Sequence, residues 1–504
     1  MKVCLMFRDR DFELPAELRP QQGDLAQDIG LQPMLEAMAA GEDGLIFKAA
    51  QTALIDSFGL DASAVRYRQG ILRDAIQHPD LIKEMYDLTA AALEGRRQHY
   101  FGVLSNYPSG TLHMSLEIMH VFIDILHKLR DMADMHADTF QSEGFTTMLA
   151  MLRAEFSDAY FAEVEQHLKD LELPRGVLMS ARLGAGNDGM DYVLRMPKDA
   201  HDSWLSRLLR KGPPSHTFRV AERDEAGFRA LSELRDRGLD LAANALAQSA
   251  EHILSFFEVL RLELAFYIGC LNLRERLAAI GAPIVFPEVL ACGAHALHFA
   301  ELVDASLALS MGHAIVGNTV NTRGAQLVII TGANQGGKSS FLRSIGLAQV
   351  MMQSGMFVAA QSFSGALCTG LFTHYKREED DTLSSGKFDE ELARMSTLAD
   401  EMRPGALVLF NESFASTNER EGSDVARQIV RAMLEARIRV FFVTHLYDLS
   451  HSYVGHPEPA VHFLRAERNP DGSRPFRLVE AEPLDTSYGE DLYREIFSAR
   501  ASVG

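Results

Sequence analysis

The chain has 504 residues, 47% of them hydrophobic, and its 49 Lys and Arg against 69 Asp and Glu give a formal net charge of −20. This length corresponds to about three to four domains, and the hydrophobic content predicts a globular protein with buried cores. The negative charge argues against non-specific coating of DNA, because the mean field of the protein repels phosphate. Any contact with nucleic acid must therefore come from local basic patches.

The cysteines and the first residues of the chain bear on its compartment. Cys4, Cys270, Cys292 and Cys368 are scattered without the C-x-x-C spacing of zinc sites, which is typical of buried thiols in a reducing compartment. The opening stretch MKVCLMFRDRDFELP lacks the apolar core of a signal peptide, and no apolar run is long enough to span a bilayer. We therefore expect a soluble cytoplasmic protein.

Residues 1–110 predict an N-terminal helical region. Apolar residues recur at helical spacing over 45–58 and 64–93. The dipeptide His78-Pro79 interrupts the second run, and proline is favoured in the first turn of a helix. A new helix should therefore begin at Pro79.

Residues 111–285 predict a helical core, or lever. Two long helices are expected over 111–173, and apolar residues form one stripe over 145–171. Helical spacing returns over 226–280. A helix or helix pair of about fifty residues would span roughly 75 Å, so it could carry motion between distant parts or act as a static strut.

A β-containing, clamp-like insertion is expected at about 174–221, between these helices. Residues 176–183 and 191–196 predict two strands around a glycine-rich turn. A basic cluster beside the only tryptophan, Trp204, is either a solvated face or a contact for a phosphate backbone. The cluster consists of Arg207, Arg210, Lys211 and Arg219.

Residues 286–504 predict an α/β domain with a largely parallel sheet, because strands and helices alternate there. Glycine and proline at 281–287 mark the boundary near residue 285. The expected strands are 327–330, 356–359, 406–410 and 440–443, the expected helices are 338–354, 388–402, 423–436 and 490–498, and a hairpin is expected to join 460–467 to 476–481.

The stretch LVIITGANQGGKSSFLR, residues 327–343, predicts a phosphate-binding loop. Its residues Gly332, Gly337, Lys338 and Ser339 fill the pattern G-x-x-x-x-G-K-[ST] between a β-branched strand and an amphipathic helix. Backbone N–H groups at a helix N-terminus favour an anion. Lys338 would reach the β- and γ-phosphates of ATP, and the Ser339 hydroxyl would bind Mg²⁺. The remaining candidates for nucleotide contacts in this stretch are Asn334, Gly336 and Ser340.

A glycine-rich turn with an unrelated lysine is the alternative to a phosphate loop, and the strand before it and the helix after it argue against that alternative. A later apolar strand ends in Asn411-Glu412. Phosphate-loop hydrolases usually place an Asp here to hold Mg²⁺, often through water, and a Glu beside it to orient the attacking water. Asn411 can accept a hydrogen bond from a metal-bound water, but it lacks the negative charge. We expect weaker Mg²⁺ affinity and slower hydrolysis.

Two further stretches have a functional and a structural interpretation. His445 follows the strand at 440–443 and could donate to the γ-phosphate, or it is a hydrogen-bonded polar residue at a strand end. The stretch LSSGKF, with Ser385 and Gly386, resembles the LSGGQ signature with which ABC ATPases cap a partner's nucleotide. It is also a plausible plain N-cap of the following helix.

As a set, these stretches resemble the MutS family of DNA mismatch-repair ATPases. TGANQGGKSSFLR, SGMFVAA, LVLFNESFASTNEREG and FVTHLYDLS follow the order and spacing of that family, and the resemblance covers about 300–490. The tetrapeptide TSYG at 486–489 is similar to a stretch near the end of the family's ATPase domain. Upstream, VRYRQGILRDAIQHPDLI resembles the helical core of MutS, and the long helices around the insertion resemble its lever and clamp.

The resemblance implies an ABC-like ATPase domain that binds ATP and Mg²⁺ within a homodimer. Lys338, Ser339 and Glu412 would act in one subunit, and Ser385-Gly386 would complete the composite site from the other. Such a dimer would bind duplex or branched DNA as a clamp in mismatch repair or related DNA maintenance. The alternative is a nucleotide-gated scaffold ATPase with slow hydrolysis that acts on a protein partner and does not bind DNA.

The sequence also departs from the MutS pattern. Too few residues precede the helical core for the mismatch-reading and connector domains of a full MutS, so we expect a short branch that lacks both. Asn411 replaces the family's Walker B aspartate. Ile315 occupies the position where MutS proteins usually have an aromatic residue that stacks on adenine, so apolar packing is expected to hold the base.

Overall fold

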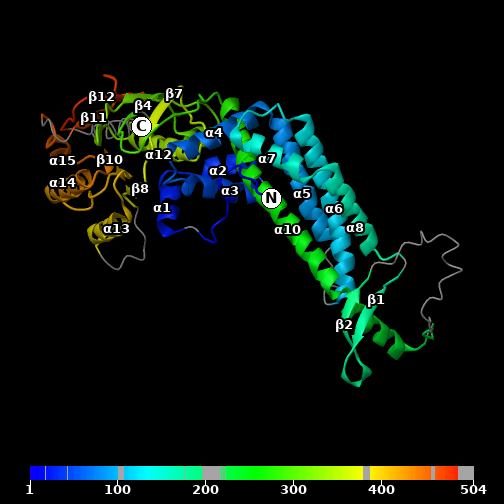
Figure 1. Ribbon diagram of the computed structural model, residues 1–504. Coiled ribbons are helices and arrows are strands. Elements are labelled where there is room, and N and C mark those ends of the chain that lie inside the picture. The colour runs from blue at the N-terminus through cyan, green and yellow to red at the C-terminus, as the bar shows by residue number, and fades with distance from the viewer. Residues whose placement is uncertain are drawn as a thin grey trace, which may run out of the picture. The chain divides into compact units, whose positions relative to one another are not determined.

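The computed structural model describes the chain apart from residues 18, 42–43, 100–106, 175, 196–216, 218, 222, 378–385, 456–459 and 486–504. Its contacts form two compact units (Figure 1). Unit 1 comprises Met1–Val3, Lys83–Phe140 and Thr146–Arg261, and unit 2 comprises Cys4–Ile82, Gln141–Phe145 and Leu262–Gly504. The domain bounds expected near residues 110 and 285 remain predictions, because compactness alone does not show which segments fold independently.

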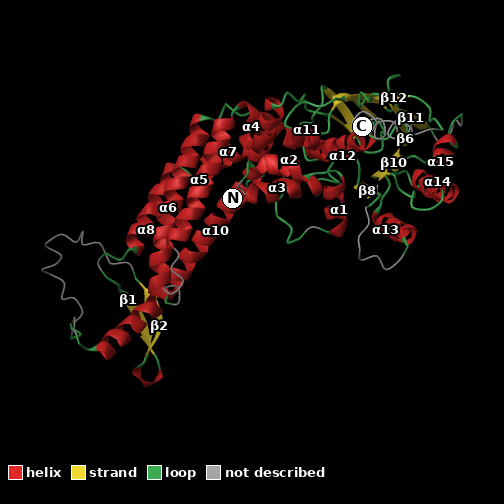
Figure 2. Ribbon diagram, turned by 180° about the vertical axis from the view of Figure 1, so that it is seen from behind, coloured by secondary structure: helices red, strands yellow, loops and turns green. Residues whose placement is uncertain are grey.

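Unit 1 consists of long helices and one β-hairpin (Figure 2). Phe122 and Phe257, from two of these helices, pack with their ring centroids 5.4 Å apart. Gly95 allows another close approach, because a Cβ there would lie 2.6 Å from Val121 Cγ1. The elements are α5 (Pro79–His99), α6 (Pro108–Met135), α7 (Glu143–Glu155), α8 (Asp158–Leu171), β1 (Met179–Leu183), the 3-10 turn η2 (Ala185–Asn187), β2 (Gly189–Leu194) and α10 (Glu225–Ala279). The first residues of α5 and α7 and the last part of α10 belong to unit 2.

The apolar stripe over 145–171 is divided between α7 and α8, so the expectation of two long helices over 111–173 is wrong. The break is at Ser157, whose backbone is extended and whose hydroxyl accepts a hydrogen bond from the Tyr160 N–H at 3.3 Å. This is an N-cap, which starts a new helix. Spacing alone did not reveal it, because Phe156 and Phe161 are both buried and continue the stripe across the break.

The hairpin expected within the insertion is present, with strands at Met179–Leu183 and Gly189–Leu194 in place of the expected 176–183 and 191–196, whereas the lever and clamp roles stay predictions. Strands β1 and β2 pair antiparallel, with Met179 opposite Leu194. Helix α10 is a single helix of 55 residues. In the basic cluster, Arg219 is exposed. Trp204, Arg207, Arg210 and Lys211 lie outside the described residues.

Unit 2 contains the α/β part of the chain and four helices from its first 82 residues. Helix α4 ends at Gln77 and α5 begins at Pro79, as the proline predicted. The elements are α1 (Pro20–Asp28), α2 (Gln32–Ala39), α3 (Gly44–Ile55), α4 (Ala62–Gln77), β3 (Glu288–Leu290), β4 (Leu297–Leu302), α11 (Ala305–Met311), β5 (Asn318–Asn321), β6 (Leu327–Gly332), α12 (Lys338–Gln353), β7 (Ser362–Ala366), β8 (Leu371–Tyr375), α13 (Lys387–Glu401), β9 (Leu407–Asn411), α14 (Glu419–Glu435), β10 (Arg439–Val443), α15 (Tyr447–His451), β11 (Val461–Ala466) and β12 (Leu478–Glu480).

A six-stranded sheet in the order β12-β11-β6-β10-β9-β8 is the centre of unit 2. All its pairs are parallel except β11 with β12, the expected hairpin. Ile329, Phe410 and Phe442 belong to the core that α13 and α14 complete. Helix α12 packs on Leu409, since a Cβ on Gly346 would lie 3.1 Å from Leu409 Cδ1. Side chains alternate between the faces of a strand, so helices cover both faces.

Two expectations for this unit are wrong, and one sheet was not expected. Residues 356–359 form no strand: they are buried, but only Val358 pairs, in an isolated bridge with Val285. Helix α14 begins at Glu419 instead of residue 423, because the Asn418 side chain caps it by accepting from the Glu421 N–H. A second sheet, in the order β3-β7-β4-β5, was not anticipated. Its strands are short, and β3 with β4 and β5 come from a stretch without clear alternation.

A buried carboxylate fixes residues 5–12 within unit 2. Glu263 on α10 accepts from the N–H groups of Leu5 at 2.6 Å, Met6 at 3.1 Å and Phe12 at 2.9 Å. The Arg68 Nε–H donates to Met6 O at 2.9 Å. Burial raises the pKa of Glu263 to about 7, and the three N–H groups oppose that rise. The carboxylate is therefore held by backbone donors that would otherwise be buried without a partner.

Replacing Glu263 by Ala should lower the free energy of unfolding of the unit by about 3 kcal/mol or more, because it leaves these N–H groups unpaired. Thermal unfolding followed by circular dichroism would measure the loss. Glu258→Ala is the matched control, since this glutamate is exposed on the same helix. Equal midpoints for the two variants would contradict the structural role of Glu263.

Candidate active site

The phosphate loop connects β6 to α12, and its glycines have structural reasons. Gly332 and Gly337 have positive φ values of 110° and 87°, which side chains disfavour. A Cβ on Gly332 would lie 2.8 Å from Ala466 N, and one on Gly336 would lie 2.7 Å from Ala466 Cβ. The end of β11 therefore packs directly on the loop. Asn334 lies half-buried on the loop and Ser340 half-buried in the first turn of α12.

Lys338 is the first residue of α12, and its ammonium group points back into the loop. Only 5% of the residue is exposed. Its Nζ donates to Gly332 O at 3.1 Å and Ala333 O at 3.0 Å. Burial lowers the pKa of Lys338 to about 8, the positive charge of Arg474 adds to this, and Glu412 opposes it. The lysine is thus a desolvated cation at a helix N-terminus, where an anion is favoured.

The carboxyl ends of three neighbouring parallel strands bring the other predicted residues to this loop. Val443 at the end of β10 pairs with Ile330 on β6 and with Asn411 on β9. The Ser339 hydroxyl donates to Asn411 Oδ1 at 3.2 Å. Ligands of parallel α/β sheets bind at this edge. Ser339 and Asn411, far apart in sequence, therefore form one polar pair.

Glu412 and His445 form a second pair at the same edge. Glu412 has a φ of 56°, and its N–H donates to Val443 O at 2.9 Å. His445 Nε2 lies 2.9 Å from Glu412 Oε1. This hydrogen bond lowers the pKa of Glu412, with burial opposing it, so the carboxylate stays ionised at neutral pH. His445 is therefore a hydrogen-bonded polar residue at a strand end, which is its structural interpretation. The same contact places its ring beside Glu412, the candidate residue for orienting the attacking water.

The residues present fit ATP with Mg²⁺. Oxygen donors of the kind that Mg²⁺ prefers, the Ser339 hydroxyl and the Asn411 amide, converge beside the lysine. Within the described part of the chain, no group of three or more His, Cys, Asp and Glu side chains is arranged to hold a metal ion. A small set of protein ligands suits Mg²⁺, which is usually bound by few side chains together with substrate phosphates and water.

The predicted signature loop is described only at its end. Gly386 is the N-cap residue of α13, with φ −66° and ψ 145°, whereas Ser385 lies outside the described residues. Asp389 and Glu390 are in the first turn of this helix. Their charges complement the helix dipole, as in an ordinary helix start, and an anion arriving there would meet them. Both interpretations of LSSGKF therefore stay open.

The segment after β11 contacts the phosphate loop, and sequence reasoning did not single it out. A Cβ on Gly337 would lie 3.5 Å from Phe476 Cβ and Phe476 O, and Arg474 is close enough to influence Lys338. The sequence of residues 469–473 predicts only a turn. The contact depends on strand order in the sheet, which local sequence does not encode.

Ile315, the residue at the position where the resemblance to MutS implies an adenine-stacking aromatic residue, is half-buried.

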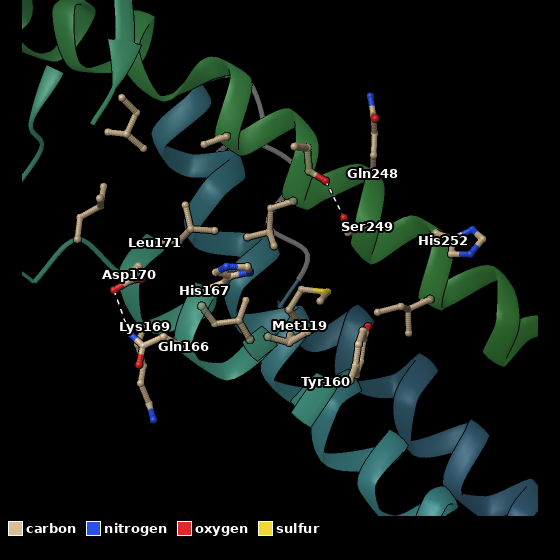
Figure 3. A pocket seen from close by; sticks show the side chains of 18 of the residues that line it. Met119, Tyr160, Gln166, His167, Lys169, Asp170, Leu171, Gln248, Ser249 and His252 are labelled. Atoms are coloured by element: carbon tan, nitrogen blue, oxygen red, sulfur yellow. Dashed lines mark hydrogen bonds between the residues drawn. The ribbon is translucent and has the colours of Figure 1, made fainter. Parts of the chain in front are cut away.

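A pocket of about 1470 Å³ lies within unit 1 (Figure 3). Met119 comes from α6, His167 and Leu171 from α8, and Gln248 and His252 from α10. The residues of the phosphate loop are not among its lining, so it is not part of the candidate nucleotide site.

Among the described helices, none combines the length and apolar character needed to cross a membrane.

Comparison with known proteins covers both parts of the chain. The family described as MutS2 N-terminal domain matches residues 60–280, and the family described as MutS domain V matches residues 328–496. The first match relates the helices upstream of the α/β part to the MutS2 N-terminal domain, whereas the sequence motifs indicated only a MutS-like helical core. The second includes the phosphate loop and the strands that end at Asn411 and Val443.

Several named relatives match part of the chain. The MutS protein homolog 4 of Mus musculus is 30% identical over 137 residues, which are 27% of this chain and 14% of that protein. The DNA mismatch repair protein MutS of Thermus aquaticus is 30% identical over 169 residues, 33% of this chain and 20% of that protein. The same-named protein of Petrotoga mobilis is 30% identical over 168 residues, 33% and 21%. The matched segment thus spans at most about a fifth of these relatives. The two family matches, the named relatives and the strand-edge geometry together place this chain in the MutS family.

Proposed function

We propose that this chain is a MutS-type ATPase that binds ATP with Mg²⁺ and hydrolyses it slowly. The observation that carries the proposal is the convergence of Lys338, Ser339 and Glu412 at the carboxyl ends of β6 and β9, beside a glycine loop that opens a helix. Among phosphate-binding sites, this combination of buried lysine, hydroxyl and carboxylate is typical of nucleotide hydrolases.

Each residue has a role that its surroundings support. Lys338 and the first amides of α12 would bind the β- and γ-phosphates. Ser339 would hold Mg²⁺ directly, and Asn411 would hold it through water, where the metal would neutralise phosphate charge. Glu412, kept ionised by His445, would orient the attacking water. His445 would also lie within reach of the γ-phosphate side of the site.

Slow hydrolysis follows from Asn411. Its amide oxygen occupies the position beside Ser339 where a carboxylate would bring a full negative charge to the metal. A metal site with one charge fewer binds Mg²⁺ less strongly. Binding of ATP, rather than its turnover, would then be the main event at this site.

We further propose that two copies of the chain form composite sites and that the dimer binds duplex or branched DNA. Family membership supports both parts, and two of the relatives cited above are named DNA mismatch repair proteins. The ABC-like arrangement of the ATPase domain, completion of the site by the Ser385-Gly386 loop and the clamp role of the insertion belong to this proposal. Mismatch repair or related DNA maintenance is the corresponding process.

A nucleotide-gated scaffold without DNA binding is the second candidate. Asn411 and the net charge of −20 favour it, because the first slows hydrolysis and the second repels phosphate backbones. In this case closure of the site around ATP would move a protein partner. The site residues and their roles are the same in both candidates.

The two candidates differ in their response to nucleic acid. ATP hydrolysis should be measured alone and with homoduplex, mismatched duplex, branched DNA and RNA, together with binding at low salt, where phosphate contacts are strongest. We expect DNA to bind and to change the ATPase rate. Lys338→Ala, which removes the loop cation, should abolish ATP binding. Absence of binding to every nucleic acid at low salt would leave only the scaffold candidate, and unchanged nucleotide affinity in Lys338→Ala would overturn the site assignment.

Replacing Asn411 by Asp should raise the hydrolysis rate about tenfold or more, because a carboxylate would strengthen the Mg²⁺ site. Steady-state phosphate release at several Mg²⁺ concentrations would show both a higher kcat and a lower Mg²⁺ requirement. Asn418→Asp, a change of the same type at the N-cap of α14, is the control. If the rate does not rise in Asn411→Asp, the site is adapted to asparagine.

Nucleotide binding should be coupled to protonation of Lys338. Its pKa of about 8 leaves most of this lysine neutral at about pH 8.5 in the free protein, and a bound polyphosphate stabilises the ammonium form. Binding should therefore take up a proton at about pH 8.5 and take up far less at about pH 7, where the lysine is already protonated. Calorimetry in buffers of different ionisation enthalpy measures this uptake. Identical uptake at both pH values would contradict the depressed pKa.

A further inference from the structure

The segment between β11 and β12 lies against the phosphate loop. Ala466, the last residue of β11, packs on Gly332 and Gly336, and Phe476 approaches Gly337. These contacts come from two ends of the same segment, and the residues between them include the exposed turn at 469–473. Arg474 directly follows this turn.

Hydrogen bonds hold this segment in place. Asn318 Oδ1 accepts from the Leu478 N–H at 2.7 Å, and the Glu467 N–H donates to Arg477 O at 2.8 Å. The turn before Arg474 is closed by Asn469, whose N–H donates to Ser473 O at 2.9 Å. The backbone position of Arg474 is therefore fixed by its own strand pair and by β5.

The guanidinium of Arg474 is partly buried and lacks a partner. Its Nε is shielded from solvent and has no hydrogen-bond partner among the described residues. Burying a charged donor in this way is unfavourable unless a counter-charge is present. Arg474 lies two residues before Phe476, which packs on Gly337, the residue before Lys338. The segment that contains Arg474 therefore meets the phosphate loop next to its lysine.

We propose that Arg474 is a further phosphate-binding residue of the nucleotide site and contacts the polyphosphate of the same subunit that Lys338 contacts. This inference rests on the proposed nucleotide binding. A polyphosphate between the two groups would remove their repulsion and give the Arg474 donors an acceptor. The planar guanidinium binds phosphate oxygens through two parallel hydrogen bonds, whereas Lys338 acts as a point charge.

The neighbouring Arg477 provides the contrast. It lies on the same segment, its side chain is 51% exposed and its Nη1 lies 3.4 Å from Glu301 Oε1. It therefore already has a carboxylate partner on the surface. Arg477→Gln changes the net charge by the same amount as Arg474→Gln without removing a group from the loop.

The test measures binding of ATP, pyrophosphate and adenosine to the full chain by calorimetry. Arg474→Gln should bind ATP and pyrophosphate about tenfold or more weakly, because a charge-assisted hydrogen bond to phosphate is lost. Its affinity for adenosine should not change. Arg474→Lys should recover part of the loss, and Arg477→Gln should bind all three ligands within about twofold of the unchanged protein.

Thermal unfolding shows whether the variants fold. Arg474→Met, which keeps an apolar stem of similar length, replaces the glutamine variant if that one unfolds.

The outcomes separate this inference from the proposed function. Failure of the unchanged protein to bind ATP, or unchanged binding by Lys338→Ala, would overturn the proposed nucleotide site. If Lys338→Ala loses ATP but the uncharged Arg474 variant binds ATP and pyrophosphate as tightly as the unchanged protein, the inference about Arg474 alone is wrong. Selective loss of the phosphate-containing ligands in Arg474→Gln, with Arg477→Gln unaffected, supports it.

Discussion

The burial of the Lys338 ammonium group is the constraint on which the nucleotide site depends. The group is held by the carbonyl oxygens of Gly332 and Ala333, at the N-terminus of α12, where the N-cap residue Gly337 has no side chain to cap the first backbone donors. Charge burial without an anion is unfavourable, and it appears here as a depressed pKa. The surrounding sheet maintains this arrangement, because β10, β9 and β11 fix the edge on which the loop lies. The site is therefore preorganised for an anion and gains most of its stabilisation when one binds.

Charge balance distinguishes this site from one built for fast turnover. In the proposed site, Asn411 carries no negative charge where it would face Mg²⁺, and Arg474 would add a positive charge at the loop. Both features would make the site more positive toward a polyphosphate. Glu412 is the carboxylate whose charge raises the pKa of Lys338, and His445 Nε2 lies 2.9 Å from its Oε1. Under the proposed function, these charges would stabilise a bound nucleotide in its ground state, which would favour holding it over cleaving it.

Local sequence predicted those parts of the structure whose signals are local. The glycine pattern around Lys338, the apolar run before Asn411 and the proline at residue 79 each specify a short conformation, and the structure has the loop, the strand and the helix start. The break at Ser157 was missed because an N-cap and a helix interior differ by one hydrogen bond while the apolar spacing continues. The apolar run at 356–359 predicts a strand, but its side chains are apolar because they are buried, and only Val358 pairs, in an isolated bridge with Val285. Arg474 could not be found from its neighbours, since its place beside the loop results from β11 pairing with β6.

Helix α12 connects the phosphate loop to the buried network around Glu263 within the same unit. Its first residue is Lys338, and just beyond its end Gly355 lies so close to Arg68 that a side chain would collide with the arginine Cβ. Arg68 in turn donates to Met6 O, and the Met6 N–H donates to Glu263 on α10. Packed interiors do not deform continuously. A displacement of α12 by a bound nucleotide would therefore have to be absorbed at Arg68 or passed to residues 5–12 and to the part of α10 that begins at Leu262.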